Sequence, residues 1–127
     1  MHPILLVGLG GALGSIARYL SGVVVGRWWQ SGFPLATMLI NIAGSLIMGL
    51  FIGFLARTTP TWQGDARLFV AVGILGGFTT LSSFSLDTVA LLERGELGQA
   101  ALYVVGSVVV SVAALFVGLL IMRAGAA

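Results

Sequence analysis

The chain has 127 residues, of which 58% are hydrophobic and only 8% are charged. A soluble domain carries about 25% charged residues, so this composition excludes an ordinary water-soluble globular protein. The formal net charge is only +2, from six basic and four acidic residues, which is too few basic side chains for a nucleic-acid surface. The sequence contains no Cys, which excludes disulfides, thiolate catalysis and zinc-thiolate sites.

Four long apolar stretches follow one another along the chain. A helix of about 20 apolar residues crosses a bilayer, and each stretch reaches that length. We predict membrane-spanning helices over residues 4–25, 34–55, 68–92 and 100–122. All three tryptophans lie in the predicted connections, where an interfacial aromatic belt is expected. Residues 1–127 are therefore expected to form a single all-α domain of four transmembrane helices.

The arginines are evenly divided between the two ends of such a bundle. The side of the termini holds Arg57, Arg67 and Arg123, and the other side holds Arg18, Arg27 and Arg94. Because the counts are equal, the positive-inside rule favours neither orientation of the chain in the membrane. Two explanations stay open: short connections need few charges, or the chain inserts in both orientations. The second would permit an antiparallel homodimer.

The first span contains several glycines and one arginine. Its glycine run, residues 8–14, superficially matches a dinucleotide-binding loop, but the strand and the acidic residue of that fingerprint are missing, so helix packing is the better interpretation. Arg18 lies within the membrane or at its edge. Three interpretations of Arg18 stay open: snorkelling to the interface, a salt bridge to Asp87, or attraction of anions into a vestibule.

Two stripes of uncharged polar side chains lie in the second and fourth spans. Within each stripe the residues are four positions apart, so they share one side of the helix. The stripe of the second span is Thr37, Asn41 and Ser45, and that of the fourth span is Tyr103, Ser107 and Ser111. Spacing alone favours bridging between neighbouring helices, which contributes roughly 1 kcal/mol or less per group. The alternative is a narrow path for a small, strongly hydrated anion, because donors without fixed cations replace its water without trapping it.

The third span contains the most informative stretch, residues 73–85. Five of the seven residues from 79 to 85 bear hydroxyls, directly after the pair Gly76 and Gly77. Glycine lowers helix preference, and a helix broken here would free backbone carbonyls, which are hard ligands suited to Na⁺. A kinked helix with Ser and Thr bonding back to the backbone is the alternative.

Taken together, these segments resemble the Fluc (CrcB-type) fluoride channels. The matching stretches are GGALGSIARY (10–19), TMLINIAG (37–44) and GGFTTLSSFS (76–85), and the resemblance covers essentially the whole chain. It implies an antiparallel, dual-topology homodimer in the inner membrane, with the third helix broken in mid-membrane and two fluoride pores. It also implies passive, selective export of cytoplasmic fluoride that relieves fluoride toxicity, and no enzymatic activity.

The resemblance also implies roles for single residues. A central structural Na⁺, which is not transported, would be held by the backbone carbonyls of Gly76 and Thr79 from both subunits. An anion vestibule would contain Arg18. The pore residues would be Asn41, Phe84, Thr37, Ser83, Tyr103, Ser107 and Ser111.

One position departs from the family's pattern. The family places two phenylalanines with their electropositive ring edges toward the anion. The second of them matches Phe84, but Leu81 stands at the first position, and an isobutyl group has no such edge. Ser83 stands where many relatives have Thr, which keeps the hydroxyl.

The main alternative function is a proton-coupled exporter resembling the small multidrug resistance transporters, which share four spans, this size and dual insertion. Such an exporter needs a membrane-embedded carboxylate, expected in the first span, which contains no acid. Asp87 is the only candidate and lies near a span end. A third possibility, a membrane subunit that transports nothing, leaves the third-span motif and the polar stripes without a purpose.

Overall fold

The computed structural model describes residues 2–124, and these are helical almost throughout. Within them, four helical stretches are long and apolar enough to cross a membrane, which agrees with the all-helical, multi-pass prediction. Three stretches are single helices: α1 (Pro3–Trp28), α2 (Leu35–Thr58) and α6 (Leu97–Ala124). The third stretch, Gln63–Glu93, consists of α3 (Gln63–Ala66), the π-helix η1 (Arg67–Leu75), α4 (Gly76–Phe78) and α5 (Leu81–Glu93).

Except at the start of α2, the helices extend beyond the predicted apolar stretches, and at two of these ends a residue satisfies terminal backbone groups. At the start of α1, the Nδ1 atom of His2 accepts a hydrogen bond from the Ile4 N–H at 3.2 Å. At the end of α2, Thr59 adopts a left-handed conformation (φ 42°) and its N–H donates to the Leu55 carbonyl at 2.8 Å. Trp28 lies at the end of α1 rather than in a connection.

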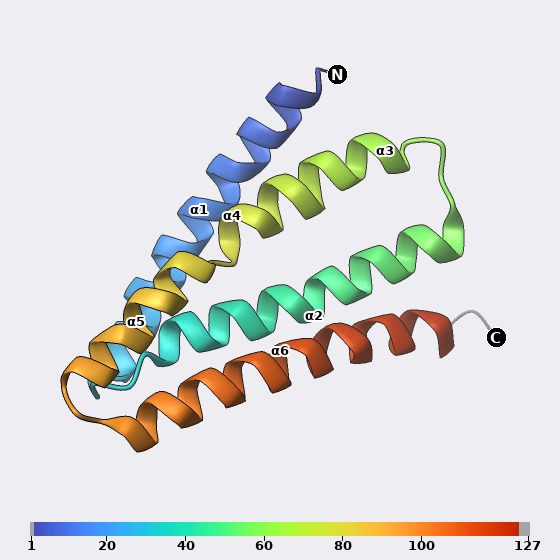
Figure 1. Cartoon of the computed structure of the whole chain (residues 1–127). Helices are drawn as coiled ribbons and strands as arrows, with labels where there is room; N and C mark the ends of the chain where they lie inside the picture. Colours follow the sequence, from blue (N-terminus) through green and yellow to red (C-terminus); the bar gives the residue numbers. More distant parts are fainter. Residues whose placement is uncertain (1, 125–127) are drawn as a thin grey trace.

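Glycines let the helix backbones touch within this chain. α2 and α6 run side by side along their length (Figure 1), and a Cβ added at Gly118 would lie 2.6 Å from the Leu46 carbonyl oxygen. α1 packs in the same way against η1 and α4: a Cβ at Gly77 would lie 2.6 Å from the Gly11 carbonyl oxygen. Small residues at helix contacts are typical of membrane bundles, and in the glycine run of α1 this packing leaves no room for a Cβ at Gly10 or Gly14.

Most large apolar side chains point away from the small interior. Leu81 is 76% exposed, and Val112 and Phe116 on α6 are more than half exposed. Fully covered side chains are few, the largest being Tyr103, Leu55 and Leu91. Apolar surface on this scale is stable only against lipid or a protein partner.

The third stretch is interrupted at Thr79 and Thr80, which have extended backbones between α4 and α5. Gly76 and Gly77 themselves remain helical, so the interruption lies after the glycine pair, at the threonines. The Thr80 hydroxyl accepts a hydrogen bond from the Ser83 N–H at 3.1 Å and caps α5. The side chain of Thr80 therefore starts a second helix rather than continuing the first.

Candidate functional site

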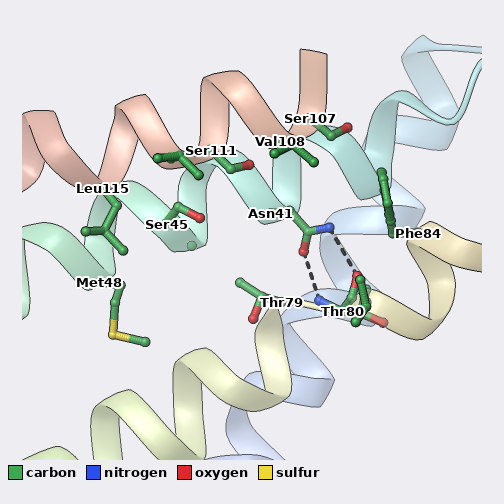
Figure 2. A pocket seen from close by; sticks show the side chains of 13 residues that line it. Asn41, Ser45, Met48, Thr79, Thr80, Phe84, Ser107, Val108, Ser111 and Leu115 are labelled. Carbon is green, nitrogen blue, oxygen red and sulfur yellow. Dashed lines mark hydrogen bonds between the residues drawn. The ribbon is translucent and has the colours of Figure 1, made fainter. Parts of the chain in front are cut away.

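A cavity of about 380 Å³ lies between α2, α6 and the interruption at the two threonines (Figure 2). None of the described residues that line it carries a charge. Leu81, Val108 and Val112 line the cavity and are exposed, so the cavity is open on that side of the chain. Its polar lining residues are Asn41, Ser45, Thr79, Thr80, Ser107 and Ser111.

Asn41 is held against the backbone of Thr80 by two hydrogen bonds (Figure 2). Its Oδ1 atom accepts from the Thr80 N–H at 2.8 Å, and its Nδ2 atom donates to the Thr80 carbonyl at 3.1 Å. A reversed amide would set a donor against a donor and an acceptor against an acceptor, so the pairing fixes the orientation of the amide. One of the two Nδ2 protons is used in this way, and the second is left for another acceptor.

This pairing and the cap of α5 each divert the helical donor of one carbonyl beside the interruption. In a continuous helix the Thr80 N–H would reach the Gly76 carbonyl, but it donates to Asn41 instead. The Ser83 N–H would reach the Thr79 carbonyl, but it donates to the Thr80 hydroxyl. Carbonyl oxygens freed in this manner are hard ligands that suit Na⁺, so Gly76 and Thr79 fit the expected cation.

A second cavity of about 340 Å³ lies between α1, α2 and the start of α5. Arg18 lines it, together with Thr37 and Ser83, and Thr80 lines both cavities. The Arg18 Nε atom donates to the Gly77 carbonyl at 3.1 Å. The predicted pore residues are therefore divided: Asn41, Phe84, Ser107 and Ser111 line the first cavity, and Thr37 and Ser83 line the second.

Tyr103 is completely buried and is not among the residues that line either described cavity. Its hydroxyl donates to the Asp87 carboxylate at 3.1 Å. Its ring packs between Phe33, edge-on at 5.7 Å between centroids, and Phe84 at 5.1 Å. The salt bridge considered between Arg18 and Asp87 is wrong, because the two side chains bind different partners on different elements.

Ser107 and Ser111 on α6 carry buried hydroxyl oxygens; Ser107 is buried as a whole residue, and Ser111 is partly exposed. Among the residues that the structure describes, neither hydroxyl has a hydrogen-bond partner, although both oxygens are buried. Bridging between helices, which spacing alone favoured, is thus not what these two hydroxyls do. Unmade hydrogen bonds at buried hydroxyls are costly, and both side chains line the first cavity.

Sequence reasoning missed Thr80, which lines both cavities and orients Asn41. The signal that the sequence offers is a threonine at a possible N-cap position, three residues before the N–H that it caps. Such a pattern is ordinary at helix starts and does not indicate a functional residue. The contact between Arg18 and Gly77 was also missed, since no sequence pattern links residues 59 positions apart.

Comparison with known proteins identifies the family of the chain. The family described as "CrcB-like protein, Camphor Resistance (CrcB)" matches residues 5–119. A Nitrobacter winogradskyi protein named "Fluoride-specific ion channel FluC" is 53% identical over 120 residues, covering 94% of both chains. Proteins of the same name from Rhodospirillum centenum and Agrobacterium fabrum are 49% and 50% identical, covering 100% and 97% of this chain and 100% and 98% of their own length. Matches of this extent show that the chain belongs to the CrcB-like family.

Proposed function

We propose that this protein is a fluoride-selective ion channel that lets cytoplasmic fluoride leave the cell passively. Relatives that match nearly the whole chain carry that name. The observation that carries the proposal is the first cavity, whose described lining combines amide and hydroxyl donors with no charged side chain. Neutral donors replace the hydration of a small anion and still release it, as conduction requires.

Each residue of the cavity has a distinct task in this mechanism. Thr80 holds the Oδ1 atom of Asn41 away from the anion, and the remaining Nδ2 proton is donated to it. The free hydroxyls of Ser107 and Ser111 supply further donors along α6. Phe84 lines the same cavity, and the electropositive edge of its ring would face the anion. The membrane potential, negative inside, drives the anion outward by about 2.3 kcal/mol per 100 mV.

A structural Na⁺ is proposed at the carbonyls of Gly76 and Thr79. Bound there, the ion would supply a fixed positive charge and would not be transported. The diversion of the Thr80 and Ser83 N–H groups to side-chain acceptors supports this site, because it frees both carbonyls. Two carbonyls are too few for a cation that is otherwise stripped of water, so a second subunit would complete the coordination.

The proposed assembly is an antiparallel, dual-topology homodimer in the cell inner membrane. The even division of arginines between the two ends of the bundle supports it. So does the exposed apolar rim of the first cavity, formed by Leu81, Val108 and Val112. The interruption would lie in mid-membrane, since Thr79 and Thr80 fall near the centre of the stretch Gln63–Glu93.

Fluoride efflux from liposomes tests this function. The purified protein is reconstituted with a potassium ionophore as a charge shunt, and fluoride and chloride release are recorded with ion-selective electrodes. We expect fast release of fluoride that depends on the shunt, with chloride retained, and we expect Phe84→Ile to slow it. Retention of fluoride by correctly folded protein, or equal release of chloride, would refute the proposal.

The substitution Asp87→Asn distinguishes the channel function from the alternative function, a proton-coupled exporter. The Asn side chain keeps an oxygen that accepts from the Tyr103 hydroxyl but removes the titratable group that coupling requires. A channel carrying Asp87→Asn still releases fluoride, and a pH gradient concentrates no more of the anion in its liposomes than in protein-free liposomes, where HF alone crosses the lipid. Uphill transport driven by a pH gradient in the unmodified protein, abolished by this substitution, would instead favour the exporter.

A further inference from the structure

Arg18 makes a contact that an anion-attracting side chain does not need. Its Nε atom donates to the Gly77 carbonyl at 3.1 Å in a half-buried position. Gly77 lies in α4, the last helical turn before the interruption, and α5 begins a new first turn at Leu81. The Gly77 carbonyl therefore belongs to a helix end that has no following turn to supply a donor.

The glycine contact between α1 and α4 places Arg18 at this helix end. A Cβ at Gly77 would lie 2.6 Å from the Gly11 carbonyl oxygen and 3.2 Å from the Ser15 nitrogen, so the two backbones are in direct contact. Gly14 lies in the same contact, and Arg18 follows it by four residues on the same side of α1. The arginine stem is thus directed along α4 toward its last carbonyls.

The contact uses only one of the donors of the guanidinium group. Arginine carries five N–H donors in a fixed plane, and here Nε is the one bonded to the backbone. The same side chain lines the second cavity. A cation at the carboxyl end of a helical segment is also electrostatically favourable.

We propose that Arg18 is a positioning residue that closes the first half of the interrupted helix. By holding the Gly77 carbonyl, it fixes the backbone between the Gly76 and Thr79 carbonyls and so sets the directions of both. On the other side of the interruption, the Asn41 side chain fixes the Thr80 backbone by two hydrogen bonds. The inference deepens the proposed function and rests on it only where Na⁺ is concerned; the closure itself depends on the hydrogen bonds of this chain alone.

The chain offers closely matched variants for a test. In Arg18→Gln the amide nitrogen is bonded to Cδ, as the arginine Nε is, so the donor keeps its place while the charge is lost. Arg18→Met has similar length without a donor. Arg18→Lys keeps the charge but moves the nitrogen one atom farther out, and it replaces Met in the comparison if the Met variant does not fold. Arg27→Met removes a charge from the exposed last turn of the same helix and serves as the control.

Amide hydrogen exchange over residues 76–85 is the measurement, made on the full chain in lipid nanodiscs with Na⁺ or with an equal concentration of N-methylglucamine. We expect about tenfold faster exchange in Arg18→Met, the scale of one lost charge-assisted hydrogen bond. We expect about threefold faster exchange in Arg18→Gln, which keeps a neutral hydrogen bond about half as strong, and exchange within about twofold of the unmodified protein in Arg27→Met. Na⁺ should slow exchange in the unmodified and Gln proteins at lower concentration than in the Met protein.

Two results would overturn the proposal. Equal acceleration in Arg18→Gln and Arg18→Met would show that the charge, not the hydrogen bond, is what matters, and unchanged exchange in Arg18→Met would show that the contact closes nothing. If Na⁺ has no effect on the unmodified protein while the Met variant still exchanges faster than the Gln variant, the sodium site of the proposed function fails and the positioning role of Arg18 stands.

Discussion

Replacing Ser107 by alanine should raise the stability of the protein and lower the rate of fluoride efflux. The side chain is 4% exposed and its hydroxyl has no hydrogen-bond partner within residues 2–124. A buried hydroxyl without a partner costs about 1–3 kcal/mol. We therefore expect Ser107→Ala to raise the free energy of unfolding by about 1 kcal/mol, the lower end of this range.

The effect of the same substitution on transport follows from the charge of the anion. A hydrogen bond to a charged partner contributes about 1.5–3 kcal/mol, so fluoride efflux should fall between about tenfold and a hundredfold. Denaturant unfolding in mixed micelles measures stability, and liposome efflux measures transport. Ser85→Ala, at an exposed position of α5, is the control and should change neither. Destabilisation by Ser107→Ala, or unchanged efflux, would refute the reasoning.

Three further substitutions test the packing and the departure at the pore. Leu81→Phe should raise fluoride efflux severalfold, because Leu81 lines the first cavity and a ring there would add an electropositive edge; an equal or lower rate would remove Leu81 from the pore. Gly14→Ala would drive a Cβ into the Ile74 carbonyl and should lower the yield of folded protein in size-exclusion chromatography, whereas Gly22→Ala on the same helix, with nothing within 4 Å, should not. Thr59→Gly should raise the free energy of unfolding by about 1 kcal/mol, since a β-branched residue at φ 42° is strained, and a decrease in denaturant midpoint would contradict that account.

The existence of the four helical stretches could be predicted from hydropathy alone, but their internal form could not. The π-helix η1 precedes the interruption, and its nine residues show no pattern that distinguishes them from an ordinary apolar helix. The sequence indicated a break within residues 73–85 but not its exact place, and Gly76 and Gly77 stay helical. The interruption falls at Thr79 and Thr80 because Asn41, from another helix, binds the Thr80 backbone in place of the next helical turn.

For the polar stripes, the shared helix side could be predicted from the sequence, but the surroundings of each side chain could not. Spacing put Thr37, Asn41 and Ser45 on one side of α2, but that side faces two different cavities along its length. Tyr103 belongs to the stripe on α6 by spacing, yet it is enclosed by Phe33 and Phe84 and bonded to Asp87. Which cavity a side chain lines depends on the neighbours that other helices bring to it.

By itself, the sequence determined the environment and the chemistry of this protein. Long apolar runs with 8% charged residues are stable only as helices in lipid, and its motifs identified the family. Only the tertiary structure decided which groups pair: Arg18 with Gly77, Asn41 with Thr80, and Tyr103 with Asp87. Helical periodicity is a local property set by backbone hydrogen bonds four residues apart. Pairing across 16 to 59 residues depends on how closely glycine-rich helices approach, and no local pattern encodes that distance.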